Sequence, residues 1–152
     1  MKSHSFTTIM FSLFLALFTA SSYAEELLMV RTKQNFPEAM LKLQDTIRDH
    51  HYSISRVQRI DIGLTKSGYE TDKYRIVFFA DKKEVSVITN NYPHLIPHIP
   101  WKIAIFAEQQ DTLLVSADPM QFSDKNHPAA DKYLLKWKKD LKKIFNEMRK
   151  SN

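Results

Sequence analysis

The stretch that decides the fold is residues 74–119, YRIVFFADKKEVSVITNNYPHLIPHIPWKIAIFAEQQDTLLVSADP. It contains three short apolar runs, YRIVFFA (74–80), WKIAIFA (101–107) and TLLVSA (112–117). Runs of this length that are rich in β-branched and aromatic residues are typical of strands. We therefore expect this stretch to form the centre of a sheet. The dense proline and histidine turn within it, YPHLIPHIP (92–100), is where we expect a site to lie.

Local chemistry predicts the connections inside this stretch. Residues 108–111 separate two strand-like runs and predict a hairpin. Asp81 and Glu84 stand three residues apart, as in a capping box, so we expect a helix over residues 81–91, although the VSVIT within it has strand propensity. The three prolines of residues 92–100 then predict an irregular crossing, because proline lacks the N–H that regular structure needs.

The N-terminal part predicts a strand followed by an amphipathic helix. Residues 26–32 form an apolar, β-compatible run. Asn35 and Glu38 have the spacing of a capping box, and Pro37 lies in the first turn, where its missing N–H is harmless. The apolar residues that follow recur at spacings of 4, 3 and 4 and share one helix face: Phe36, Met40, Leu43 and Ile47. We expect this helix to end near His50.

The segment before the central stretch is predicted to be extended. Residues 52–62, YSISRVQRIDI, alternate between apolar and polar only roughly. This pattern predicts a strand with a bulge or break near Ser55 and Arg56. Gly63 and Gly68 bracket residues that we expect to form a strand–turn–strand connection into the central run.

Residues 128–150 predict a long amphipathic helix. Its apolar stripe recurs at spacings of 3, 4, 3 and 4: Leu134, Trp137, Leu141, Ile144 and Met148. Lysine and arginine cover most of the other faces of this helix. Because an open sheet face must be covered, we expect the stripe to dock on the sheet. The alternative is that this basic helix contacts an anionic membrane or an acidic partner.

Together these elements predict a two-layer α+β fold. The sheet is expected to be mainly antiparallel with helices on one face, in the order β-α-β-β-β-α-β-β-α. A chain of 152 residues suits a single domain. We assign residues 25–122 to the α+β domain and residues 123–152 to the basic helix packed on it.

The first 24 residues have the features of a secretory signal peptide. Lys2 supplies a basic start, residues 9–18 are apolar apart from Ser12, and Ser22 to Ala24 suits a cleavage site. We predict cleavage after Ala24 and export to the periplasm or out of the cell. The alternative, an uncleaved anchor, is disfavoured because the apolar run is shorter than the roughly 20 residues that span a bilayer.

Composition excludes several classes of chemistry. The chain has no cysteine, which removes thiolate nucleophiles, haem attachment through C-x-x-C-H and sulfur-ligated metal centres. It also lacks the G-x-S-x-G, P-loop, H-E-x-x-H and dinucleotide-binding motifs, so no motif supports catalysis. The net charge of +5 falls to +4 without Lys2, and this modest excess in an exported protein does not predict nucleic-acid binding.

This arrangement resembles the domain of unknown function family 302. The matching features are the capped helix NFPEAMLKLQDTIRDHHYSI (35–54), the strand YRIVFFA with a helix after it, the turn ending in IPWKIAIFAE (99–108), and the strand that finishes in DP. The resemblance covers about residues 27–122 and implies an α+β domain that often pairs as a dimer, with no agreed activity. Many members carry cysteines where this chain has Ala80 and Trp101, so the resemblance brings no thiolate ligand to this chain.

The sharpest polar signal is the pair His94 and His98, with Tyr92 and Trp101 as aromatic neighbours. Imidazole is a common ligand of zinc, copper and haem iron. Pro97 lies between the two histidines and removes the helical spacing of a zinc protease, so the alternative is loop histidines that form hydrogen bonds or lie in solvent. The four residues are candidate ligand-binding residues, and the two histidines are candidate metal ligands.

Two functions therefore stay open. The first is an exported, non-catalytic binding or interaction domain, favoured because every catalytic motif is missing while the core pattern is complete. The second is a haem- or transition-metal-binding protein that uses residues 92–101. Sheet edges with unpaired backbone groups, together with the family resemblance, predict a homodimer.

Overall fold

The computed structural model describes residues 26–150. Its elements follow one another in chain order: β1 (Leu27–Thr32), α2 (Phe36–Asp49), β2 (Ser53–Arg59), α3 (Ile60–Lys66), β3 (Tyr74–Ala80), α4 (Lys82–Asn91), η2 (Pro93–His98), β4 (Trp101–Glu108), β5 (Asp111–Ala117), η3 (Pro119–Phe122), η4 (Pro128–Ala130) and α5 (Asp131–Lys150). The predicted signal peptide lies outside the described residues. Within residues 26–150, no helix combines the length and the apolar character needed to cross a membrane.

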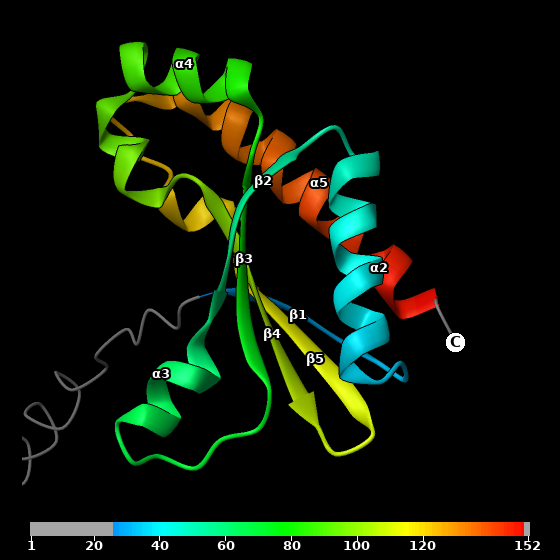
Figure 1. Ribbon diagram of the computed structural model, residues 1–152. Coiled ribbons are helices and arrows are strands. Elements are labelled where there is room, and N and C mark those ends of the chain that lie inside the picture. Colours follow the sequence, from blue (N-terminus) through cyan, green and yellow to red (C-terminus); the bar gives the residue numbers. More distant parts are fainter. Residues whose placement is uncertain (1–25, 151–152) are drawn as a thin grey trace, which may run out of the picture.

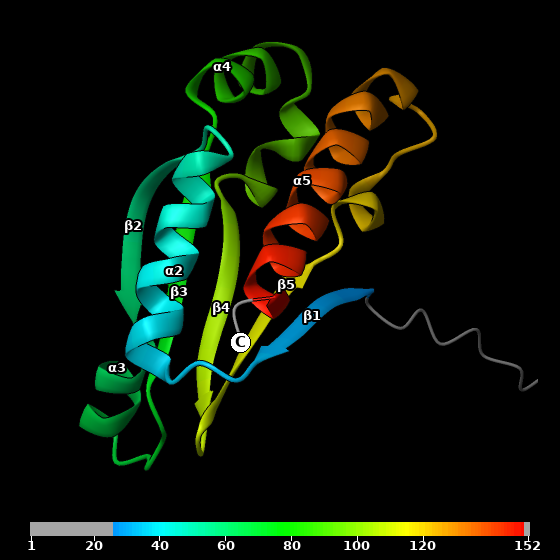
Figure 2. The same ribbon diagram turned by 90° about the vertical axis from the view of Figure 1, so that its right-hand side faces the viewer.

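The five strands form one antiparallel sheet in the order β1-β5-β4-β3-β2. Figure 2 shows the sheet with α2 and α5 in front of it, β2 at one edge and β1 at the other. The predicted α+β class and the antiparallel sheet are confirmed. The hairpin predicted at residues 108–111 is confirmed as well, and Gln109 in its two-residue turn has a left-handed φ of 54°.

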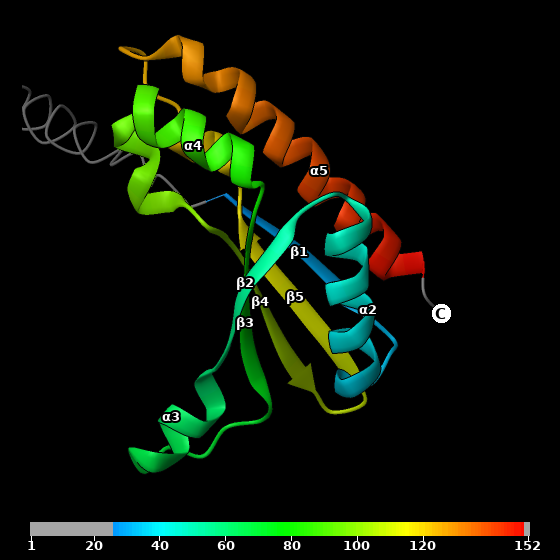
Figure 3. The ribbon, with the colours of Figure 1, turned by 45° about the horizontal axis from the view of Figure 1, so that its top comes forward.

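The helices are arranged around one face and the two ends of this sheet. Helices α2 and α5 lie side by side on the same face, whereas α4 and α3 lie at opposite ends of the strands (Figures 1 and 3). We call the face under α2 and α5 the covered face. The core between them is apolar and fully buried at its centre, with Leu114 and Ile103 from the sheet against Leu43 of α2 and Ile144 of α5.

The stripe predicted on the last helix is buried. Its five predicted members and Phe145 are at most 4 % exposed: Leu134, Trp137, Leu141, Ile144 and Met148. Burial of a large apolar side chain contributes about 2 kcal/mol. Helix α5 is therefore a major part of the core, and it docks on the sheet as its pattern predicts.

Two helix starts form as their capping patterns predict. The Asn35 side chain accepts a hydrogen bond from the Glu38 N–H at 3.2 Å and opens α2. The Asp81 carboxylate accepts hydrogen bonds from the N–H groups of Lys83 (2.7 Å) and Glu84 (3.2 Å) and opens α4. These bonds satisfy backbone donors that a helix leaves free at its start. Helix formation over residues 82–91 thus prevails over the strand propensity of VSVIT.

The segment after β2 differs from the prediction. The predicted bulge is present, as a register shift between Ile54 and Arg56, but the strand ends at Arg59. Helix α3 takes the place of the middle one of the three successive strands in the predicted order, and Gly68, at φ +86°, closes it. None of its residues is buried and its start has no side-chain cap, so the sequence carries neither an amphipathic stripe nor a capping signal.

A tertiary contact holds α3 in place. Asp61 forms an ion pair with Arg75 of β3, and both side chains are mostly buried. The Arg75 hydrogen bond keeps the pKa of Asp61 below its ordinary value. Because the partner lies 14 residues away, local propensity alone could not predict this helix.

Candidate functional site

The face of the sheet opposite the covered face has no helix across its centre in residues 26–150 (Figure 1). Successive strand residues point to opposite sides of a sheet, so this face is lined by residues that alternate with the buried ones. We call it the open face, and its apolar members are Leu27, Met29, Tyr74, Ile76, Phe78, Ala104, Phe106, Leu113, Val115 and Ala117. None of them is buried, and Met29 is 56 % exposed.

Strand register joins these side chains into continuous rows. Met29 pairs with Val115, Val115 with Ala104 and Ala104 with Ile76, so one apolar row crosses four strands. At one end of the face the Tyr74 ring meets the Phe106 ring edge-on, with centroids 5.9 Å apart. From strand spacing and rise, the apolar area measures about 19 by 14 Å, on the order of 300 Å² in plan. A contiguous patch of that size on a soluble protein is often a binding surface.

Small side chains on the open face leave a shallow hollow in its surface. A shallow hollow of ≈ 280 Å³ lies across β1, β3, β4 and β5, with Ala104 and Ala117 in its lining. A methyl group stands lower than the side chains of Ile76 and Val115, which also line the hollow. The surface is thus shaped to receive a protruding apolar side chain.

The two ends of the open face carry opposite charges. At the end near α4, Lys102 is exposed and forms no ion pair with residues 26–150. At the other end, a hollow of ≈ 530 Å³ includes Asp72, Glu108 and Arg31 in its lining. Arg31 is bound to Glu108 at 2.6 Å, whereas the Asp72 carboxylate has no partner in the described chain. The free charges are therefore positive at one end and negative at the other.

The predicted aromatic and histidine residues fall into one chain of rings. Tyr92 contacts His94 edge-on, with centroids 6.4 Å apart, and His94 stacks on His127 at 4.4 Å. Tyr92 also contacts Tyr133 of α5 at 5.7 Å. Both ring nitrogens of His94 are buried, and neither has a hydrogen-bond partner in residues 26–150.

His98 and Trp101 join the same chain of rings from its other end. His98 stacks on Phe122 with centroids 3.8 Å apart, and Phe122 stacks on Trp101 at 6.1 Å. Trp101 in turn contacts Trp137 at 4.7 Å, and Trp137 contacts Tyr133 at 6.1 Å. Burial, with a smaller effect from the Lys102 charge, lowers the pKa of His98. The four predicted residues thus lie in one aromatic cluster, but His94 and His98 stack on different rings.

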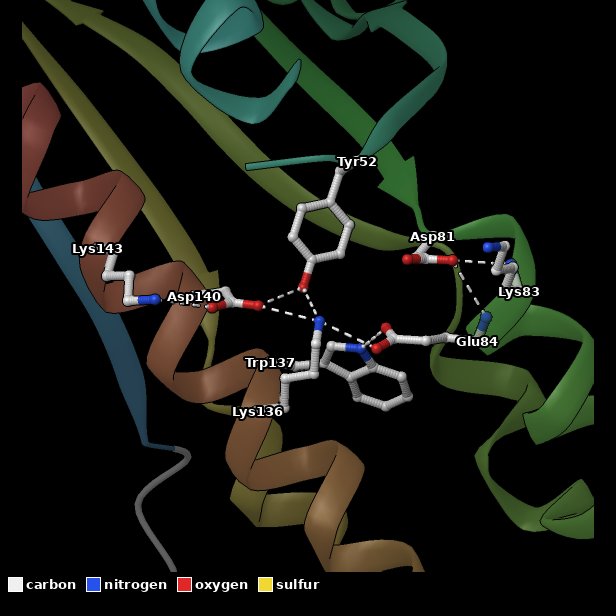
Figure 4. A network of polar contacts seen from close by, with 8 residues as sticks. All are labelled: Tyr52, Asp81, Lys83, Glu84, Lys136, Trp137, Asp140 and Lys143. Atoms are coloured by element: carbon white, nitrogen blue, oxygen red, sulfur yellow. Dashed lines mark hydrogen bonds and ion pairs between the residues drawn. The ribbon is translucent and has the colours of Figure 1, made fainter. Parts of the chain in front are cut away.

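A polar network borders this cluster (Figure 4). Lys136 of α5 binds three oxygen atoms: the Glu84 carboxylate at 2.9 Å, the Asp140 carboxylate at 3.1 Å and the Tyr52 hydroxyl at 3.2 Å. The Tyr52 hydroxyl donates to Asp140 at 2.9 Å, and the Trp137 ring N–H donates to Glu84 at 2.6 Å. The network therefore joins α5 to α4 and to the residue before β2.

Burial and hydrogen bonding shift the pKa values of three groups in this network. Burial raises the pKa of Tyr52, so the phenol stays protonated. Burial by itself lowers the pKa of Lys136, but its hydrogen bonds to Glu84, Tyr52 and Asp140 raise it overall. Burial alone raises the pKa of Asp140, and the bonds from Lys136 and Tyr52 lower it overall. General acid–base catalysis needs a group whose pKa lies near the working pH. The pKa values of Tyr52, Lys136 and Asp140 are each shifted away from neutral pH.

Comparison with known protein families identifies the chain. The sequence profile described as "Domain of unknown function DUF302" matches residues 28–148. The chain belongs to the DUF302 family. The match extends to residue 148, so it includes nearly all of α5 in the DUF302 domain.

A solved structure has the same fold as this DUF302 chain. It is the crystal structure of an uncharacterized conserved DUF302 protein from Bacillus stearothermophilus, 16 % identical, with a TM-score of 0.75. The similarity covers 83 % of this chain and all of the other chain. A comparison with curated proteins found no match.

The network and the open face of this DUF302 chain are the parts that sequence reasoning missed. Lys136 and Asp140 stand four residues apart on a predicted helix, which is a signal for an ion pair. Tyr52 and Glu84 carry no such signal, because they meet α5 only through the tertiary fold. The open face was hidden for a related reason: both faces of the central strands are apolar in sequence, so the pattern does not tell which face the helices cover.

Proposed function

We propose that this DUF302 chain is an exported, non-catalytic interaction domain that pairs with a second copy through the open face. The observation that carries the proposal is the uncovered apolar face of the sheet, in which Leu27 is 47 % and Met29 is 56 % exposed. Removing such a surface from water is favourable by about 25 cal/mol per Å². The absence of every catalytic motif that was sought in the sequence supports a role without catalysis.

The charge pattern supports a second copy as the occupant. Lys102 and Phe106 lie four residues apart on β4, or about 13 Å. When two open faces stack with their strands antiparallel across a twofold axis, Lys102 of one copy lies opposite the end of the other copy that carries Asp72 and Glu108. A twofold axis repeats every contact twice, so each uncompensated charge meets an opposite one.

The proposal is tested by the mass of the mature chain in light scattering at micromolar concentration. We expect a dimer for the wild type and a monomer for Val115→Glu, which places a charge at the centre of the open face. Leu41→Glu is the matched control, because Leu41 is a 66 % exposed apolar residue on α2, away from this face. Thermal melts of all three proteins check that each is folded.

A charge exchange tests the arrangement itself. Lys102→Glu is expected to weaken pairing at least tenfold, and the double variant Lys102→Glu with Asp72→Lys is expected to restore it. A wild-type monomer, or a Val115→Glu protein that stays dimeric, contradicts pairing through this face. A dimer that does not respond to the charge exchange contradicts the twofold arrangement.

Binding of haem or a transition metal by His94 and His98 is the second candidate function. Its support is the His94 ring, whose two nitrogens are buried and have no hydrogen-bond partner in residues 26–150. The fit is poor in two respects: the described residues contain no group of three or more metal-ligating side chains, and each imidazole is already stacked on another ring. An absorption spectrum and elemental analysis of protein from its native compartment decide the matter. A colourless, metal-free protein that does not bind added haem ends this candidate.

A further inference from the structure

The two edges of the sheet differ in regularity. At one edge, β2 carries a bulge between Ile54 and Arg56. At the other edge, β1 pairs with β5 through six successive residues, 27–32, with no shift in register. A bulge is one way in which proteins protect a sheet edge from further pairing. The edge at β1 has no bulge and no proline, and no strand in residues 26–150 pairs with its outer side.

The outward backbone groups of β1 can be assigned from the ladder. The N–H of Asp118 donates to the carbonyl of Glu26 at 2.8 Å, so this pair is hydrogen-bonded. Bonded and non-bonded pairs alternate in an antiparallel ladder. The N–H and C=O groups of Leu27, Met29 and Arg31 therefore point away from β5, in position to pair with one more strand.

A hollow of ≈ 340 Å³ lies along this edge. Its lining is shared between the start of β1 and the second half of α5: Leu27, Leu28, Met29, Lys142, Phe145, Asn146 and Arg149. Phe145 is buried and forms an apolar wall, whereas Lys142 and Arg149 are exposed. Lys142, Phe145 and Arg149 recur at spacings of 3 and 4 and so share one side of the helix.

The charge of this hollow is positive and uncompensated. Lys138, four residues before Lys142 on α5, is neutralised, because it binds the buried Asp118 carboxylate at 2.5 Å. Lys142 and Arg149 have no acidic partner in residues 26–150. A second copy paired edge to edge would bring its own Lys142 and Arg149 to the same side of the joined sheet. Like charges would then face each other, so this edge suits an acidic partner rather than another copy of the chain.

We propose that the β1 edge binds an extended acidic peptide segment of a partner protein as an added strand. Alternate residues of such a strand point to the two sides of the sheet. Acidic residues on the α5 side would meet Lys142 and Arg149, and apolar residues on the other side would continue the row of Leu27 and Met29. The backbone edge of β1 and the cations of α5 lie outside the open face, and Leu27 and Met29 border both surfaces.

The probe is a fluorescein-labelled seven-residue peptide that alternates valine and glutamate, titrated with the mature chain and followed by fluorescence anisotropy. The matched control peptide carries lysine in place of glutamate. The double variant Lys142→Glu with Arg149→Glu should lose at least tenfold in affinity for the glutamate peptide and gain affinity for the lysine peptide. The same titration with the Val115→Glu protein separates this site from the proposed pairing.

A backbone variant tests strand addition directly. Met29→Pro removes an outward N–H without removing a bond to β5, so the protein should stay folded and lose at least tenfold in peptide affinity. Arg31→Lys, which keeps both the outward N–H and the charge, should bind as the wild type does. A wild type that does not bind the glutamate peptide, or a folded Met29→Pro protein that binds it fully, overturns the proposal. Binding to phosphatidylglycerol vesicles in the absence of peptide binding assigns the surface to a membrane instead and also overturns it.

Discussion

The covered and open faces of the sheet differ in exposure far more than in sequence. On β5, Leu114 is fully buried under the helices, while its neighbours Leu113 and Val115 lie on the open face and are partly exposed. Leu113 and Leu114 are the same residue type, so hydrophobicity alone does not distinguish their roles. The position of α2 and α5 makes the difference: the covered face forms the core with these helices, and the open face has no helix across its centre in residues 26–150.

The largest effect is expected when one of the two helices on the covered face is deleted. Deleting residues 128–152 takes away α5, whose six buried apolar side chains each contribute about 2 kcal/mol. That loss is close to the whole stability of a typical domain, about 5–15 kcal/mol. We expect the truncated protein to aggregate or to melt near room temperature, as followed by circular dichroism. A truncated protein with an unchanged melt that loses only binding to anionic vesicles would make α5 a functional surface rather than part of the core.

A matched pair of alanine substitutions compares the two faces on one strand. Leu114→Ala should reduce the free energy of unfolding by about 2–5 kcal/mol, because it leaves a cavity in the core. Leu113→Ala should reduce it by less than about 1 kcal/mol, because its side chain is partly in water. Urea unfolding at low protein concentration measures both values without a contribution from pairing. Equal values for the two variants would mean that the open face is covered in solution.

The polar network on the covered side offers a smaller test. Lys136→Met leaves the Asp140 and Glu84 carboxylates, each with a side chain 15 % exposed, without their shared cation. We expect a loss of about 1–2 kcal/mol in the free energy of unfolding, reduced from that of a fully buried pair because solvent reaches Lys136. Lys139→Met is the control: Lys139 is exposed on the same helix and forms no ion pair with the described residues, so its loss should stay within about 0.5 kcal/mol.

The smallest expected effect is on the pH dependence of stability. The pKa of Asp140 is lower in the folded protein than in the unfolded chain, where it is near 3.9. The Asp140 carboxylate therefore contributes fully to the free energy of unfolding above this pH, and the contribution is lost as the pH falls through the lower pKa of the folded state. Asp140→Asn should therefore lose stability less steeply than the wild type below about pH 4. Leu41→Glu, whose new carboxylate would be exposed, serves as a control that adds a titrating group without a buried partner. If the free energies of unfolding of the wild type and of Asp140→Asn fall equally steeply below about pH 4, the proposed role of Asp140 is contradicted.

Much of the fold could be predicted because local signals decide it. The caps at Asn35 and Asp81 and the bulge in β2 each depend on residues close together in the chain, and the stripe on α5 repeats within a single helix. Helix α3 could not be predicted in this way, because its ion pair joins two elements across a loop. The same holds for Tyr52 and Glu84, which converge on Lys136 only when α5 crosses the sheet.

The candidate site could be predicted only in part for a related reason. Sequence reasoning placed it at Tyr92, His94, His98 and Trp101, and the structure brings these residues into one aromatic cluster. Sequence spacing predicts which side chains are neighbours within one helix, strand or turn. It does not predict which surface of the sheet stays uncovered after folding. The open face becomes visible only when the positions of α2 and α5 are known.

The chain of rings couples the local unfolding of the elements that carry it. Seven ring contacts join eight side chains from residues 92–98, β4, the segment after β5 and α5: His127, His94, Tyr92, Tyr133, Trp137, Trp101, Phe122 and His98. Because each ring packs on the next, no single element at this end can swing away without separating its neighbours. The amide protons of η2, η3 and the first turns of α5 should exchange with solvent as one cooperative unit. Helix α3, with no buried residue, should exchange earlier and by itself.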